Sequence, residues 1–145
     1  MREYTTKEMK RFNYLVGETG AVYHESYLKL GMSDSEGQIL YAICNHGDSC
    51  QLGEICRLSG LSKQTVNSAL RRLEGEGTVY LEASDGRRKR VCLTEQGKAL
   101  VQRTIVRLIE IENGILDSWP REELELYLEL TGKYLAALRE KIREL

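Results

Sequence analysis

The middle of the chain, residues 52–93, places two short helices directly before a hairpin, and this succession constrains the fold more than any other feature. Apolar residues at helical spacing predict one helix over 52–59 and a second from Ser62, its N-cap, to about Glu74. Gly60 marks a tight turn between the two helices. Two helices joined by such a turn form a helix-turn-helix.

A β-hairpin is predicted immediately after the second helix. Residues 78–83 are β-prone, Asp85-Gly86 is a strong turn signal, and residues 91–93 return as a strand. Four consecutive basic residues follow the turn, Arg87-Arg88-Lys89-Arg90. Such a run repels itself unless a polyanion is near, and arginine suits the negative minor groove of DNA. The hairpin is therefore interpreted as a basic wing; a flexible charged loop is the alternative.

The second helix of the pair separates apolar from polar residues. Its apolar stripe consists of Val66, Ala69, Leu70 and Leu73. An α-helix fits the major groove of DNA, where amide and hydroxyl side chains can read base edges. The first turns usually reach deepest, which favours Gln64, Thr65 and Ser68 as base contacts. Further candidates on this helix, for bases or phosphates, are Ser62, Lys63, Asn67, Arg71 and Arg72. A solvated helix face is the alternative.

Long helices are predicted at both ends of the chain. The first covers about residues 6–30, and the capping-box sequence Ser33-Asp34-Ser35-Glu36 begins the next helix. Near the other end, Thr94 caps a helix that continues to about Ile115. In the last helix an apolar seam repeats at steps of four and three residues, through Leu124, Leu128, Thr131, Leu135, Leu138, Ile142 and Leu145. The seam predicts a homodimer contact; intramolecular packing is the alternative.

Charge supports an anion-binding middle. The chain has a formal net charge of −1, yet residues 51–98 hold nine Lys and Arg against six Asp and Glu. No apolar run is long enough for a membrane span and the N-terminus does not resemble a signal peptide, so a cytoplasmic protein is expected. Four cysteines in that compartment are expected to be reduced.

The reactive residue types do not suggest catalysis. There is no Gly-rich phosphate loop, metalloprotease motif or nucleophile elbow, so we expect no enzyme, catalytic residue or cofactor. His24 and His46 are too isolated to predict a metal site. Cys44 and Cys56 fall on apolar stripes and Cys92 in a wing strand. Cys50 is expected in a loop as the exposed thiol, which leaves a cysteine-based redox sensor as an alternative.

The succession of helix, helix, helix-turn-helix, wing and two long helices resembles the multiple antibiotic resistance regulator (MarR) family, over nearly the whole chain. The segments that carry the resemblance are Glu54-Ile55-Cys56, residues 61–66, residues 70–74 with Gly77, Asp85-Gly86-Arg87-Arg88, and residues 91–97. The wing sequence followed by Leu-Thr-x-x-Gly is the most specific part. Gln51 departs from the pattern, because Thr or Ser usually opens the short helix.

The resemblance implies a two-fold dimer built from the terminal helices, with two winged domains on one pseudo-palindromic DNA duplex. It implies that Arg87 enters the minor groove and that Asp85 orients Arg87 by an ion pair. For many relatives it also implies a small aromatic ligand, which Tyr23 and Tyr27 would contact here; packing is the alternative for these tyrosines. Most members are repressors.

The expected fold class is mainly α with a small β-hairpin wing, a winged helix-turn-helix with N- and C-terminal dimerisation helices. The expected regions are 1–32 for N-terminal dimerisation, 33–98 for DNA binding and 99–145 for C-terminal dimerisation. The expected function is a sequence-specific DNA-binding transcriptional regulator, a repressor that a small-molecule ligand releases. A winged-helix module that binds protein is the competing hypothesis, although such a surface should present apolar anchors.

Overall fold

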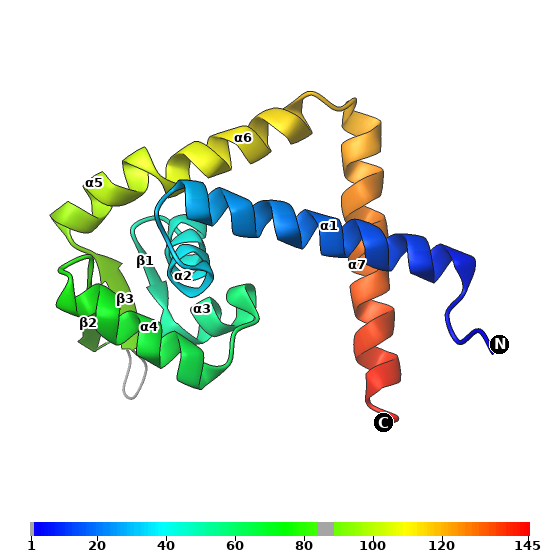
Figure 1. Cartoon of the computed structure of the whole chain (residues 1–145), viewed down its shortest axis with the longest axis horizontal. Coiled ribbons are helices and arrows are strands. Elements are labelled where there is room, and N and C mark those ends of the chain that lie inside the picture. Colours follow the sequence, from blue (N-terminus) through cyan, green and yellow to red (C-terminus); the bar gives the residue numbers. More distant parts are fainter. Residues whose placement is uncertain (1, 84–88) are drawn as a thin grey trace. The chain divides into compact units, whose positions relative to one another are not determined.

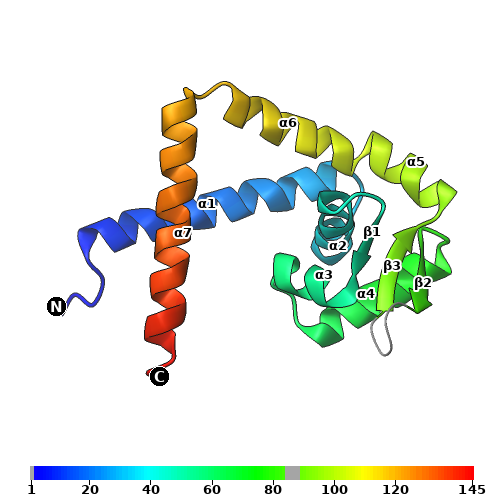
Figure 2. The ribbon, with the colours of Figure 1, turned by 180° about the vertical axis from the view of Figure 1, so that it is seen from behind.

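The computed structural model describes residues 2–83 and 89–145. The chain divides into two compact units, Met1–Leu108 and Ile109–Leu145, which are described separately. The first unit contains α1 (Lys7–Lys29), α2 (Asp34–Asn45), β1 (Ser49–Gln51), α3 (Leu52–Ser59), α4 (Lys63–Gly75), β2 (Val79–Ala83), β3 (Lys89–Leu93) and α5 (Glu95–Arg103). Helix α6 (Ile105–Asp117) continues into the second unit, which ends with α7 (Arg121–Ile142) (Figures 1 and 2). The predicted fold class is confirmed.

Four helices begin where the sequence offers a hydroxyl to cap them. The side chains of Thr6, Ser33, Ser62 and Thr94 each accept a hydrogen bond from the backbone amide three residues further on. These bonds satisfy amides that have no partner inside the helix. The capping box at Ser33 is confirmed, because Ser33 Oγ also donates to Glu36 Oε1 at 3.0 Å.

The core of the first unit lies between α2, α3, α4 and the sheet. Its largest fully buried side chains include Ile39, Ile43, Ile55, Val66 and Val91, one or two from each of these elements. Gly60 between α3 and α4 adopts a left-handed conformation with φ of 69°, which a side chain would disfavour. The predicted helix-turn-helix is therefore present and packed on its apolar stripe.

The sheet has three antiparallel strands in the order β1-β3-β2, one strand more than the predicted hairpin. Val79 pairs with Leu93, and on the other side of β3 Cys50 pairs with Val91. The prediction that Cys50 lies in an exposed loop is wrong, since Cys50 is in β1 and only 1% exposed. A three-residue strand has too short a pattern to be predicted and forms only because β3 offers its free edge.

The predicted continuous helix after Thr94 is also wrong in one respect, because it is interrupted at Thr104. Thr104 has φ of −128° and ψ of −85°, outside the helical region, and separates α5 from α6. Its hydroxyl donates to the carbonyl of Leu100 at 2.7 Å, a bond that competes with regular helix geometry. Apolar spacing continues through the break, which is why the sequence pattern concealed it.

Among the described residues, none of the helices combines the length and the apolar character that crossing a membrane requires.

Candidate nucleic-acid interface

Helix α4 presents a polar face away from the core. Val66, Ala69, Leu70 and Leu73 are buried, as predicted, so the opposite side of α4 faces outward. Gln64, Ser68 and Arg71 occupy that side and are all exposed. Two flanks border them, one with Lys63 and Asn67 and the other with Thr65 and Arg72. The outward face therefore carries amide, hydroxyl and guanidinium groups, the types that can read base edges.

The N-cap of α4 forms hydrogen bonds with one of the residues predicted to contact base edges. Ser62 Oγ accepts from the Thr65 backbone amide at 3.1 Å and donates to Thr65 Oγ1 at 2.9 Å. The Thr65 hydroxyl therefore accepts a bond inside the cap and keeps its own hydrogen and its second lone pair for another partner. Gln64 and Ser68 have their polar groups on the outward face.

Arg72 lies on the flank that reaches α2. Its Nη1 donates to Glu36 Oε1 at 3.1 Å, and the two residues are 36 positions apart in the chain. The Glu36 side chain is 18% exposed and the Arg72 side chain 55%. The predicted recognition residue Arg72 is thus part of an ion pair within the protein.

The two described basic residues at the base of the wing differ in exposure. Arg90 is half-buried and donates from Nη1 to Ser49 Oγ at 2.9 Å, which ties β3 to β1. Lys89, the preceding residue, is exposed. Asp85, Arg87 and Arg88, the predicted residues at the wing tip, lie outside the described residues.

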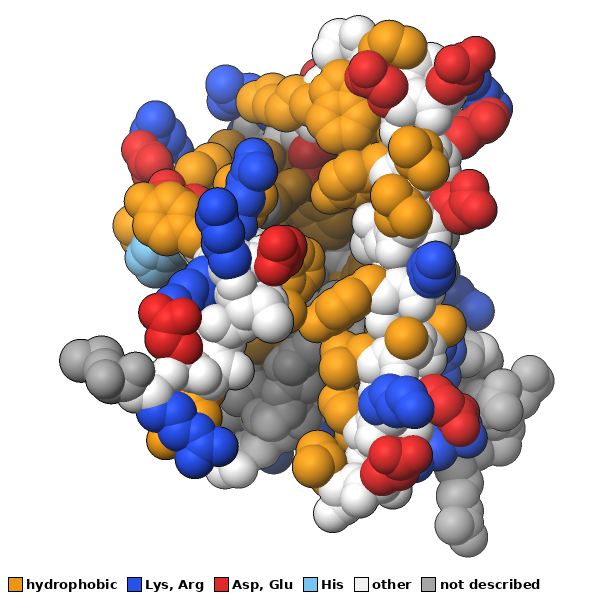
Figure 3. Space-filling view, turned by 90° about the vertical axis from the view of Figure 1, so that its right-hand side faces the viewer, with side chains coloured by type: hydrophobic (Ala, Val, Ile, Leu, Met, Phe, Trp, Pro, Cys, Tyr) orange, Lys and Arg blue, Asp and Glu red, His pale blue; other side chains and the backbone are white. Residues whose placement is uncertain are grey.

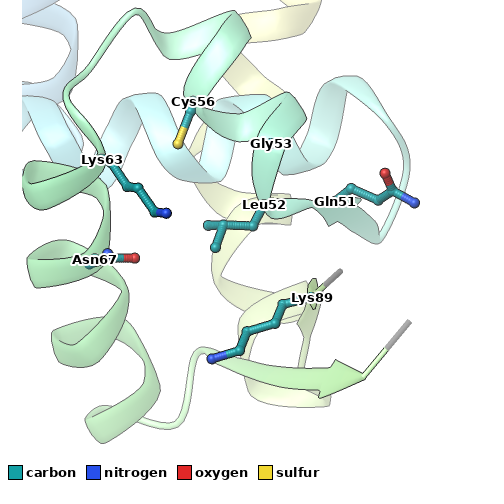
Figure 4. A pocket seen from close by; sticks show the side chains of 7 residues that line it. All are labelled: Gln51, Leu52, Gly53, Cys56, Lys63, Asn67 and Lys89. Carbon is teal, nitrogen blue, oxygen red and sulfur yellow. The ribbon is translucent and has the colours of Figure 1, made fainter. Parts of the chain in front are cut away.

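A groove of about 620 Å³ lies between α3, α4 and the start of β3. In Figure 4 the ammonium groups of Lys63 on α4 and Lys89 on β3 both extend into the space between these elements. The groove is lined by Gln51, Leu52, Gly53, Cys56, Lys63, Asn67 and Lys89, and none of these is acidic. The groove therefore favours an anion.

Sequence reasoning missed the contribution of α3 to this groove. Leu52 and Cys56 line it, but on the sequence they read only as members of an apolar stripe. The one available signal was the polar start of α3 at Gln51, which forms no side-chain cap bond. Only the packing of α3 beside β3 reveals the shared groove.

The thiols are mostly protected. Burial raises the pKa of the Cys50 thiol, with a further contribution from Glu54, and burial likewise raises that of Cys92. Burial and then the charge of Asp48 raise the pKa of Cys44 to about 11. A thiol of raised pKa is a poor nucleophile at neutral pH. Among the four cysteines, Cys56 is the one that lines the groove, and it is half-buried.

The two tyrosines proposed for a ligand pocket differ in exposure. Tyr27 is 6% exposed and Tyr23 is half-buried. A side chain added at Gly37 would overlap the Tyr27 ring, so the ring packs directly on α2. This contact supports the packing interpretation for Tyr27, while a ligand role stays a prediction.

Apolar side chains remain exposed on both terminal helices. On α1 they include Phe12, Leu15, Val16 and Val22, each more than two-fifths exposed. The seam on α7 is also open, with Leu128, Leu135, Leu138 and Ile142 exposed and Leu124 half-buried. Figure 3 shows hydrophobic side chains running along α7 with charged side chains at its edge. Exposed apolar surface of this extent indicates an interaction site.

A capped recognition helix beside a basic sheet edge, on a chain with long terminal helices, defines a winged helix-turn-helix protein. Residues 30–90 match the family model described as the MarR family. Over these residues the chain is similar to the MarR family. A comparison with curated protein sequences found no significant match.

Solved structures share this fold. A MarR-family transcriptional regulator from Silicibacter pomeroyi is 25% identical, with a TM-score of 0.68 over 87% of this chain and 86% of that one. Staphylococcus aureus MepR in its DNA-binding conformation is 24% identical, with a TM-score of 0.75 over 92% and 99% of the two chains. Bordetella bronchiseptica BpsR, whose DNA binding is regulated by 6-hydroxynicotinic acid, is 16% identical, with a TM-score of 0.63 over 94% and 99%.

Proposed function

We propose that this protein is a sequence-specific DNA-binding transcriptional regulator. The observation that carries the proposal is the combination of a polar outward face on α4 with a groove whose described lining residues include Lys63 and Lys89 and no carboxylate. Amide and hydroxyl side chains supply base readout in the major groove, and the lysines neutralise phosphates. The Staphylococcus aureus relative of the same fold is described in a DNA-binding conformation.

The parts have separate tasks in this proposal. Gln64 and Ser68 read base edges because they lie exposed on the outward face of α4, and Thr65 contributes its hydroxyl. Lys63, Asn67 and Lys89 contact the phosphate backbone along the groove. The resemblance to the MarR family implies that Arg87 enters the minor groove and that Asp85 orients Arg87 by an ion pair, and we propose the same roles here.

The proposed active form is a homodimer. Apolar residues are exposed on α1 and, separately, on α7. Covering them stabilises an assembly, because burial of apolar surface contributes about 25 cal/mol of free energy per Å². A second copy of the chain supplies matching surfaces in a two-fold assembly. Two recognition helices then read half-sites about one helical turn apart, so the operator is pseudo-palindromic.

A dimer that occupies a promoter represses transcription. A small aromatic ligand that favours another arrangement of the dimer would release the dimer from the DNA. The ligand part of the proposal draws on the Bordetella bronchiseptica relative, whose DNA binding 6-hydroxynicotinic acid regulates. The pKa directions of Cys44, Cys50 and Cys92 disfavour a cysteine-based sensor in place of a ligand.

The test is a binding titration of the full chain on a random-sequence DNA duplex at several salt concentrations. A DNA-binding regulator loses affinity steeply as salt rises, because each neutralised phosphate contributes about −0.9 to the slope of log affinity against log salt. A winged-helix module that binds protein shows no binding at any salt concentration. Footprinting on a duplex selected by the protein should then protect two related half-sites, and a single half-site at full occupancy contradicts the dimer.

A further inference from the structure

The first turn of α2 joins the recognition helix to α1. Three residues of this turn each contact a side chain of another helix, and they are Asp34, Glu36 and Gly37. Glu36 receives Arg72 of α4 at 3.1 Å. On the other side, Asp34 Oδ2 lies 2.8 Å from His24 Nδ1 of α1. Gly37 lies under the Tyr27 ring, which also belongs to α1.

The bond between Arg72 and Glu36 is well placed electrostatically. Glu36 stands in the first turn of α2, where the helix dipole favours a negative charge. Arg72 stands in the last turn of α4, where the dipole favours a positive charge. The carboxylate oxygen Oε1 accepts from both Arg72 Nη1 and Ser33 Oγ. Because Ser33 in turn accepts from the Glu36 backbone amide at 3.2 Å, the carboxylate is held in one orientation.

Arg72 therefore differs from its neighbour Arg71. Arg71 lies on the outward face of α4, whereas Arg72 lies on the flank toward α2 with its guanidinium on Glu36. A guanidinium already paired with a carboxylate carries little net charge toward a phosphate. We infer that Arg72 is a positioning residue. Through its bond to Glu36, Arg72 holds α4 in a set orientation on α2. Because the first turn of α2 also contacts α1, the same bond sets the orientation of α4 relative to α1.

This inference rests on the proposed function, because the orientation of α4 matters only if α4 reads DNA. In a dimer joined by α1, the same connection governs how the two recognition helices are presented to successive half-sites. Losing the connection should reduce sequence-specific binding more than nonspecific binding, since phosphate contacts tolerate small rotations and base contacts do not.

The test compares Arg72→Ala with Arg71→Ala and Glu36→Ala on two probes. One probe is a random-sequence duplex, and the other is a duplex selected from a randomised pool by the unmodified protein, each titrated at several salt concentrations. Arg72→Ala and Glu36→Ala should each weaken binding to the selected duplex by roughly tenfold, as expected for one ion pair lost per subunit. Neither should change the salt slope or binding to the random duplex.

The sign of the Glu36→Ala effect is decisive. If Glu36 does not act through Arg72, removing a carboxylate near DNA leaves affinity unchanged or increases it, and that result overturns the inference. A smaller salt slope for Arg72→Ala also overturns it, because Arg72 would then contact a phosphate. The Glu36→Ala/Arg72→Ala double variant should bind no more weakly than either single variant, and Arg72→Lys should restore most of the specific affinity.

Two controls keep the outcomes separate. Arg71→Ala should weaken binding to both probes and reduce the salt slope, which tests the proposed function itself. If the unmodified protein binds neither duplex, the proposed function fails, whatever the Arg72 variants do. Circular dichroism on each variant confirms that helicity is retained, and Arg72→Lys, which keeps the charge, remains informative should Arg72→Ala unfold.

Discussion

The winged region from α2 to β3 and the two terminal helices use apolar residues in opposite ways. Ile43 in α2 is 0% exposed, whereas Val16 in α1 is 54% and Leu135 in α7 is 45% exposed. The winged region buries its apolar residues among its own helices and strands. Helix α7 contains no buried residue at all. One region is therefore complete in a single chain, and the terminal helices depend on further contacts.

This difference separates two kinds of stability. Substitutions in the winged region should change the free energy of unfolding at any protein concentration. Substitutions on the exposed faces of α1 and α7 should change stability in a way that depends on concentration, because folding and association are linked in a dimer.

The largest effect is expected on the α7 seam. Replacing Leu135 and Leu138 together by Glu should give monomer or loss of fold, because a dimer would gather four carboxylates in an apolar contact. Sedimentation velocity measures the outcome. Lys133→Glu with Ala136→Glu is the matched control on the polar side of α7 and should leave the dimer intact. A stable dimer of native helicity in the seam variant would rule out this seam.

The next effect concerns the core of the winged region. Ile43→Ala should lower the free energy of unfolding by about 2–5 kcal/mol, because it leaves a cavity at a fully buried site. Leu58→Ala is the control in the same region, since Leu58 is 48% exposed and its loss should have a small effect. Chemical denaturation at two protein concentrations gives both values. Equal losses for the two variants would contradict the assigned core.

A third prediction divides the interface between base readout and phosphate contact. Gln64→Ala should leave random-duplex affinity nearly intact and cost about 1–3 kcal/mol on a selected duplex, if the contact is bidentate. Lys89→Ala should weaken both affinities and flatten the salt dependence, and Arg87→Ala is expected to do the same. Affinity titrations at several salt concentrations measure both. An unchanged slope for both basic variants would remove the wing from the interface.

The smallest effect is a difference in thiol reactivity. Iodoacetamide at neutral pH should label Cys56 roughly tenfold faster than Cys44, Cys50 or Cys92, because burial raises the pKa of those three thiols. Since Cys56 lines the groove, bound duplex should slow its labelling. Mass spectrometry of digested samples identifies the site, with Cys56→Ser as the control. Preferential labelling of Cys50 would contradict its buried place in β1.

The sequence by itself determined the elements whose signals are local. The hydroxyl caps at Ser33, Ser62 and Thr94 were enough to predict helix starts, and the apolar stripe of α4 was enough to predict a buried face. The β-prone residues 78–83 and 91–93 were enough to predict two paired strands. Such signals act over a few residues, since a cap bonds an amide three positions away and a helix face repeats every turn. For this reason the winged helix-turn-helix could be predicted from residue pattern.

Only the tertiary structure decided what depends on residues distant in the chain. Strand β1 exists because β3 offers an edge, and that pairing buries Cys50, which the sequence pattern placed in a loop. Lys63 and Lys89 share a groove, and Arg72 binds Glu36 across 36 positions. Such pairings depend on how whole elements pack, so they could not be predicted from the spacing of residues along the chain.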